Sequence, residues 1–126
     1  MEIVKQTYER LDEACLDELR ELTAFVRNPT RFENLISLFL EGLEPQVAAM
    51  RESFSARNGI GLADLAHGLR GSAASFGALH LAWLCAQLEE GCADQGLDRA
   101  CTTLEQIEHE AVAVLHILRR EILQDS

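Results

Sequence analysis

His67 is the residue of this chain whose surroundings best suit it to chemistry. Leu62, Leu65 and Leu69 define the buried edge of a helix, and at about 100° per residue His67 projects roughly 160° away from that edge. We therefore expect its imidazole to face water. A neutral imidazole is a nucleophile near physiological pH, so it can accept a phosphoryl group and pass it on.

The residues around His67 on the expected helix are mostly small. Gly68 and Gly71 each cost about 0.8 to 1 kcal/mol of helix stability relative to alanine, which indicates that something compensates for them. Glycine on an outer face lets another surface approach closely, and the nearby Arg70 guanidinium can balance the charge of a phosphoryl group. We expect Arg70 and Gly71 to support the phosphate, and we expect a docking surface formed by Ala63, Asp64, Gly68 and Ala74.

The residues that follow His67 resemble the pattern of the histidine-containing phosphotransfer (HPt) domains of bacterial and eukaryotic phosphorelays. That pattern is His, any residue, Leu, Lys or Arg, Gly, Ser or Ala, and Ala, followed by a Gly-Ala corner and a Leu-Glu pair. The matching residues are His67-Gly-Leu-Arg-Gly-Ser-Ala-Ala-Ser-Phe-Gly-Ala78, Leu81, Leu84-Cys85 and Leu88-Glu89. The core of the resemblance spans residues 62–92, and a weaker resemblance runs from about Leu16 to Leu118.

The resemblance implies an up-down-up-down four-helix bundle in which His67 takes phosphate from an aspartyl phosphate of one receiver domain and yields it to the aspartate of another. Arg70 takes the position of the family's usual Lys, and Gly71 that of its small neighbour. Glu89, grouped with the phosphate-supporting residues, takes a position where some members carry Gln. A carboxylate there would favour imidazolium and would repel a phosphate that came close, so the role of Glu89 stays open.

The partners that the resemblance implies are response-regulator receiver domains and a hybrid sensor histidine kinase. The chain has no Gly-rich phosphate loop and no strand, turn and helix to hold one, so we expect a phosphocarrier without ATP-dependent kinase activity. We expect no bound cofactor, and we expect the receiver to supply Mg²⁺. A second hypothesis is a helical docking module that regulates a signalling partner without using phosphate.

Apolar residues at alternating three- and four-residue steps predict that helices position these residues. We expect a first helix from about Glu2 to Arg27, with a break near Asp12. A second helix should start at Asn28-Pro29-Thr30 and should be kinked near Glu41 to Glu44 by Pro45. A third helix should run from about Ile60 to a corner at Gly77, a fourth from that corner to near Gly96, and a fifth from Leu97, capped by Asp98, to Leu118. The pattern predicts an all-α fold over residues 1–126, a single domain formed by an antiparallel four-helix bundle whose end is covered by the N-terminal helix.

Composition excludes several classes of partner. The net charge of −10 disfavours nucleic acid and anionic membrane surfaces, and we expect a cytoplasmic protein that acts as a monomer. Cys85 and Cys92 are seven residues apart, roughly 10.5 Å along a helix, which is too far for a disulfide. We expect the cysteines to be free thiols, and the spacing of cysteines and histidines predicts no metal site.

Less specific interpretations apply to several other residues. His80, His109 and His116 are expected to be ordinary surface or structural histidines. Trp83 is expected to be a partly buried packing residue, although an aromatic near a docking surface can also bind a partner. For Arg70 the alternative is a solvated arginine paired with Asp64 or Glu89.

Overall fold

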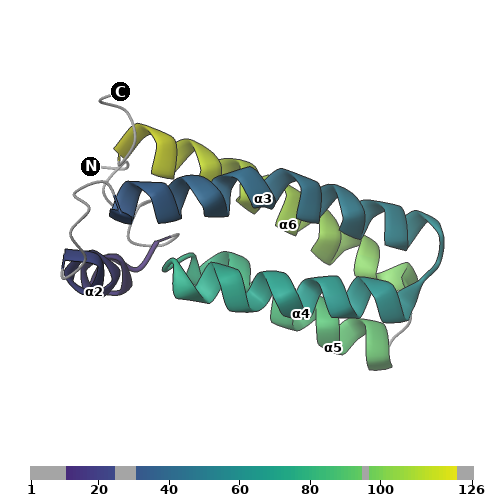
Figure 1. Ribbon diagram of the computed structural model, residues 1–126. Helices are drawn as coiled ribbons and strands as arrows, with labels where there is room; N and C mark the ends of the chain where they lie inside the picture. The colour runs from purple at the N-terminus through teal and green to yellow at the C-terminus, as the bar shows by residue number, and fades with distance from the viewer. Residues whose placement is uncertain (1–10, 25–30, 95–96, 122–126) are drawn as a thin grey trace, which may run out of the picture.

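The computed structural model describes residues 11–24, 31–94 and 97–121. Within these ranges the chain forms helices and no strand, namely α2 (Glu13–Ala24), α3 (Arg31–Ser55), α4 (Gly59–Ser75), α5 (Leu79–Asp94) and α6 (Leu97–Glu121). Helices α3 and α6 form one layer of a bundle, and α4 and α5 form the other (Figure 1). The predicted all-α four-helix bundle with an additional N-terminal helix is confirmed.

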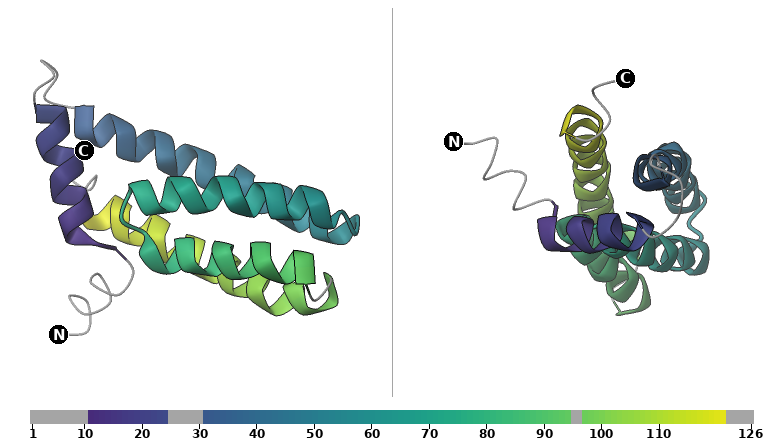
Figure 2. Two further views of the ribbon diagram at one scale, coloured as in Figure 1. Left: turned by 90° about the horizontal axis from the view of Figure 1, so that it is seen from below. Right: turned by 60° about the vertical axis from the view of Figure 1, so that its left-hand side comes forward.

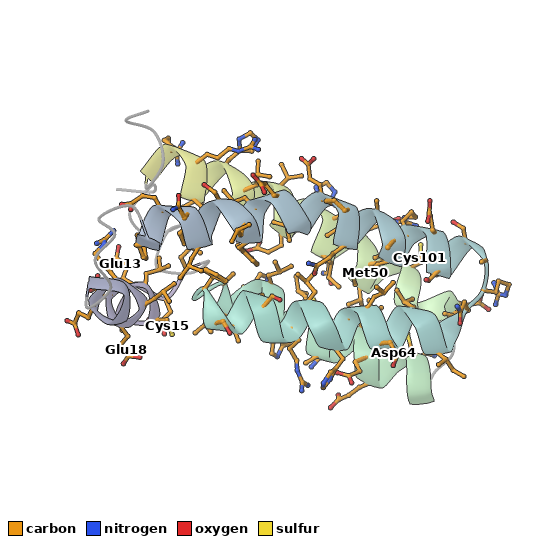
Figure 3. The ribbon with its side chains drawn as sticks, viewed as in Figure 1. Glu13, Cys15, Glu18, Met50, Asp64 and Cys101 are labelled. Carbon is orange, nitrogen blue, oxygen red and sulfur yellow. The ribbon has the colours of Figure 1, made fainter. Side chains whose placement is uncertain are left out.

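Each helix of the bundle turns an apolar stripe inward, because residues three and four apart share one face. The α3 stripe buries Phe32, Ile36, Phe39, Leu43 and Met50, with Val47 and Phe54 partly buried. Met50 is fully buried and lies between α3 and α4 (Figure 3). Their spacing is the alternation of three- and four-residue steps from which this helix was predicted.

Helix α2 runs across one end of the bundle rather than along it (Figure 2). It begins directly after Asp12, whose Oδ1 accepts a hydrogen bond from Ala14 N at 3.0 Å, which is the contact of a helix cap. Asp12 N donates to Gly77 O at 2.5 Å, so the start of α2 is tied to the corner between α4 and α5. The predicted corner at Gly77 is confirmed. The start of α2 after Asp12 agrees with the break expected there, but the part of the expected helix that precedes it lies outside the described residues.

Gly77 is required at this corner for two reasons. Its φ of +78° is a left-handed conformation that side chains disfavour. A Cβ added there would also lie 2.7 Å from Asp12 O. Glycine therefore permits the turn and the close approach of α2 together.

The helix boundaries agree with the sequence at some positions and differ at others. Asn58 caps α4, since its Oδ1 accepts from Gly61 N at 2.9 Å. The prediction that Asp98 caps the last helix is wrong: α6 already includes Leu97, so Asp98 lies in the first helical turn. There its negative charge interacts favourably with the positive end of the helix dipole. Its Oδ1 also forms an exposed ion pair with a guanidinium nitrogen of Arg57 at 3.4 Å.

Helix α3 continues through Pro45 without interruption. The bend expected near Glu41 to Glu44 therefore does not end the helix, and its size stays a prediction. The predicted start of this helix at Asn28-Pro29-Thr30 lies outside the described residues.

Arg51 of α3 and Glu108 of α6 join the two helices of one layer. Arg51 Nε donates to Glu108 Oε2 at 3.0 Å, and a second guanidinium nitrogen donates to Oε1 at 2.6 Å. This two-point contact raises the pKa of Arg51 and lowers the pKa of Glu108.

None of the described helices combines the length and apolarity needed to cross a membrane.

Candidate functional site

Helix α4 presents His67 to solvent. The buried edge of the helix consists of Leu62, Ala66, Leu69 and Ala73, and His67 lies on the other side with 64% of its side chain exposed. The outward direction expected from the helical spacing is thus confirmed. An exposed imidazole on a rigid helix can be reached by a second protein.

Helix α5 places Glu89 against the imidazole. His67 Nδ1 lies 3.0 Å from Glu89 Oε2, which is hydrogen-bond distance. An ionised carboxylate can only accept a hydrogen bond, so this contact favours the tautomer with the proton on Nδ1. The lone pair of the neutral ring is then on Nε2, which becomes the nucleophilic nitrogen.

Arg70 lies on the other side of the same carboxylate. One of its guanidinium nitrogens is 3.4 Å from Glu89 Oε1. That oxygen is shielded from solvent and makes no hydrogen bond with acceptable geometry, so the ion pair with Arg70 is the contact that balances its charge. Of the two pairings considered for Arg70 from the sequence, the structure forms the one with Glu89.

The small residues beside His67 leave open space. A Cβ added at Gly68 or Gly71 would meet no atom within 4 Å, so packing within this chain does not require glycine at either position. Asp64 and Ala74 are exposed and Ala63 is half-buried, and Asp64 lies at the outer edge of α4 (Figure 3). The open space favours the interpretation that another surface approaches here.

The nearby cysteine offers no competing nucleophile. Cys85 is fully buried on α5, close enough to Glu89 and Arg70 to feel their charges. Burial and the Glu89 carboxylate raise the pKa of its thiol to about 12, while Arg70 acts in the opposite direction. The thiol stays neutral and unreactive, and all four cysteines of the chain are free, as predicted.

Trp83 differs from its prediction as a partly buried packing residue, because 56% of it is exposed. Its ring stacks on His80, with centroids 5.9 Å apart and planes 14° apart. Ile60 and Leu79, which were not predicted to be exposed apolar residues, are 80% and 46% exposed. A sequence signal for Ile60 existed, since it precedes His67 by two helical turns and so shares its face.

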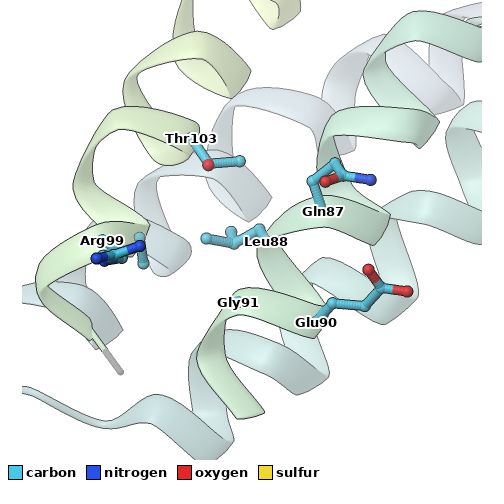
Figure 4. Close-up of a pocket in the computed structure, with 7 residues that line it drawn as sticks. Gln87, Leu88, Glu90, Gly91, Arg99 and Thr103 are labelled. Carbon is cyan, nitrogen blue, oxygen red and sulfur yellow. The ribbon is translucent and has the colours of Figure 1, made fainter. Parts of the chain in front are cut away.

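Two surface cavities lie elsewhere. One of about 180 Å³ lies between α5 and α6, where Leu88 of α5 points toward Arg99 and Thr103 of α6 (Figure 4). The other, of about 440 Å³, lies between α3 and α6 and is mainly apolar. Neither cavity is lined by His67. In the parts of the chain that the structure describes, no group of three or more His, Cys, Asp or Glu side chains is arranged to hold a metal ion.

A profile of the Hpt domain family matches residues 34–117, more than half of the chain. The structure is similar to histidine-containing phosphotransfer protein B from Pseudomonas aeruginosa, with a TM-score of 0.82 and 27% identity over 93% of this chain and 96% of that chain. The fold is also similar to ZmHP2, a histidine-containing phosphotransfer protein from maize, with a TM-score of 0.84 and 18% identity over 97% and 90% of the two chains. No curated protein sequence matches this chain.

Proposed function

This chain belongs to the Hpt domain family and is a histidine phosphotransfer protein of a phosphorelay, and we propose that it carries the phosphoryl group on Nε2 of His67. One observation carries this proposal: His67 is 64% exposed, and its Nδ1 contacts Glu89. That contact leaves the lone pair on the other ring nitrogen. The residues next to it on the exposed face of α4 are mostly small.

In the proposed step, the Nε2 lone pair attacks the phosphorus of an aspartyl phosphate on a receiver domain. The bond between phosphorus and the aspartate oxygen breaks, and the aspartate leaves as a carboxylate with the electron pair. Because Nδ1 keeps its proton, the phosphorylated imidazole carries a positive charge. In onward transfer the aspartate of a second receiver attacks the phosphorus, and Nε2 leaves with the electron pair as a neutral imidazole.

Glu89 supports both directions of transfer. Its carboxylate favours the reactive tautomer before phosphorylation, and it offsets the positive charge of the ring afterwards. Keeping the Nδ1 proton makes the ring a good leaving group. The repulsion between Glu89 and phosphate is limited because they contact different nitrogens of the ring, and because Arg70 pairs with the second oxygen of Glu89.

Arg70 and Gly71 complete the proposed site. Arg70 is half-exposed one turn from His67, so its guanidinium is placed to offset phosphate charge as well as that of Glu89. Gly71, with open space where a Cβ would be, leaves room for the incoming aspartate. Ala63, Asp64, Gly68 and Ala74 surround the approach.

The family interacts with receiver domains in phosphorelays. For this chain we propose that a hybrid sensor histidine kinase supplies one receiver and a response regulator the other. The monomer is the acting unit, and Mg²⁺ is held by the receivers rather than by this chain.

The test is phosphate transfer from a receiver. Incubation with a ³²P-labelled receiver and Mg²⁺ should move label to this protein, and His67→Ala and His67→Gln should fold normally but accept none. The matched control is His109→Ala, an exposed histidine of α6, which should accept label at the parental rate. The label should be lost in acid and retained in base, as expected of a phosphoramidate. Labelling of folded His67→Ala would show that another residue carries the phosphate, and a folded parent that accepts none would favour a docking module.

A further inference from the structure

Large apolar side chains are exposed on the helices that form the site. Those exposed in the described part of the chain are Leu38, Ile60, Leu79, Trp83 and Val112. Ile60 belongs to α4, and Leu79 and Trp83 belong to α5. Three of the five therefore lie on the two helices that carry His67 and Glu89, and exposed apolar side chains around one site indicate a surface that is covered in a complex.

The helical geometry places Ile60 on the same side of α4 as His67. At about 100° per residue, seven residues bring the direction back to within about 20°, and the two residues are about 10 Å apart along the axis. Ile60 therefore lies two turns from the nucleophile on the same exposed face.

On α5 the reference direction is Glu89, which points to the edge shared with His67. Leu79 and Trp83 are rotated from it by about 80° and about 120°, toward solvent, whereas the buried Cys85 is rotated the other way. Trp83 is about 9 Å from Glu89 along the axis, in the direction of the Gly77 corner. Leu79 and Trp83 thus border the face that carries the site.

Between these bulky residues the surface is low. Gly71 and Ala74 on α4 are exposed, and Ala86 on α5 is half-buried. Exposed carboxylates, Asp64 on α4 and Glu90 on α5, flank it. The face therefore consists of small residues bordered by apolar side chains and by exposed carboxylates, in a chain whose net charge is −10.

The size of a protein interface decides whether a receiver covers Trp83. A standard interface buries about 800 Å² on each partner, which corresponds to a disc of roughly 16 Å radius. A receiver that brings its aspartate to His67 must centre its contact there, so Trp83 and Ile60 fall within the covered area. Tryptophan is one of the residue types, with tyrosine and arginine, that are enriched among the residues that contribute most of the binding energy of an interface.

Stacking on His80 orders the Trp83 side chain before a partner binds. Ring planes 14° apart and centroids 5.9 Å apart hold the indole against its neighbour while 56% of the residue stays exposed. A side chain that is already ordered loses less entropy on binding than a free one.

From these observations we propose that Trp83 is the principal contact through which receivers dock, with Ile60 and Leu79 at the edge of the same surface. The partner that fits is a receiver that presents an apolar side chain beside its phosphorylatable aspartate, flanked by lysine or arginine residues that pair with Asp64 and Glu90. This inference rests on the proposed transfer at His67.

Transfer kinetics test the role of Trp83. Trp83→Ala should lower kcat/KM for transfer from a phosphorylated receiver by about tenfold or more, mainly through a higher KM, and Trp83→Phe should keep most of the activity. Phosphorylation by phosphoramidate, which needs no docking, should be unchanged in both. The control is Leu38→Ala, which removes an apolar side chain that is 64% exposed on α3, in the other layer, and should transfer at the parental rate.

Fluorescence gives a second measurement, because Trp83 is the only tryptophan of the chain. Adding an unphosphorylated, tryptophan-free receiver should shift its emission to shorter wavelength, and His67→Gln should show the same shift because docking needs no phosphate. An unchanged emission, or a parental KM for Trp83→Ala, would overturn the role of Trp83 while leaving transfer at His67 intact. A parent protein that neither donor labels at His67 would instead overturn the proposed function, and this inference with it.

Discussion

Glu89 follows His67 by 22 residues in the sequence, yet its Oε2 lies 3.0 Å from the Nδ1 atom of His67. The contact forms because α4 and α5 pack antiparallel on either side of the Gly77 corner. The chemistry of the imidazole therefore depends on the register between two helices. Arg70 extends the same arrangement to a row of three charged or polar groups.

Replacing Glu89 should separate its two effects. Glu89→Ala removes the acceptor at Nδ1, so transfer from a receiver should slow by about tenfold or more, since small losses of orientation are costly. Phosphorylation by phosphoramidate should then give a larger share of the Nδ1 isomer, measured by ³¹P and ¹⁵N NMR. Glu89→Gln retains an oxygen acceptor and should be milder. An unchanged isomer ratio and an unchanged rate in Glu89→Ala would mean that Glu89 does not orient the ring.

Replacing Arg70 tests how its charge is used. Arg70→Ala should slow transfer or shorten the lifetime of phosphohistidine while leaving the bundle folded, and Arg70→Lys should be milder because a cation remains. The double variant Arg70→Ala/Glu89→Gln decides the cause: recovery of the rate means that Arg70 mainly neutralises Glu89, and no recovery means that it acts on the phosphate. Equal activity of parent, Ala and Lys proteins would leave Arg70 an ordinary surface residue.

Gly77→Ala should destabilise the fold. The left-handed φ costs about 1 to 2 kcal/mol for a residue with a side chain, and the added Cβ would lie 2.7 Å from Asp12 O, so α2 must move or the corner must distort. We expect thermal unfolding by circular dichroism to show a Tm lower by about 5 °C or more. Gly68→Ala is the control, because it meets no atom within 4 Å and gains helix propensity. A Tm at or above the parental value for Gly77→Ala would show that the corner does not need glycine.

The helices and the direction of His67 could be predicted because both follow from residues close in sequence. Leu62 and Leu69 mark the buried edge of α4, and the angle to His67 is fixed by the helix itself. Asp98 shows the limit of this approach, since α6 begins at Leu97, two residues before the start that a cap at Asp98 would require, so the expected cap is a first-turn residue.

Contacts between helices could not be predicted in this way. Glu89 was identified by its position in a motif, but its hydrogen bond to Nδ1 depends on how α4 and α5 pack. Trp83 was expected to pack because aromatic residues bury large areas. It is exposed because its place on α5 points away from the core, and the small stripe of Ala82 and Ala86 beside it offers no cover.

The Arg51 and Glu108 pair predicts how acid affects stability. The contact lowers the pKa of Glu108 below its ordinary value of 4.5 in the folded state, so its contribution is fully present above that pH and is lost as pH falls through the lower folded value. Other carboxylates titrate in the same range, so the useful quantity is the difference between parent and Glu108→Gln. Urea unfolding should show the parent more stable at pH 7, with the difference shrinking below about pH 4.5. A difference that stays constant with pH would exclude this role for the charge.

Gly71→Gln should separate stability from function. Gly71 lies four residues after His67 on the exposed side of α4, and a Cβ there would meet no atom within 4 Å, so a side chain fits the monomer. Replacing a helix-interior glycine should raise stability by up to about 1 kcal/mol, and Tm should stay the same or rise. The glutamine would, however, occupy the space through which a receiver's aspartate must reach Nε2, and displacement by about 1 Å can slow an in-line transfer on the order of a hundredfold. Transfer from a receiver should therefore be much slower, while phosphorylation by phosphoramidate should change far less.

Gly91→Gln is the matched control. It replaces another helical glycine where an added Cβ would meet open space, on the α5 surface that faces α6, and it should keep the parental rate. If Gly71→Gln exchanges phosphate with a receiver as fast as the parent, the small residues around His67 are not a docking site.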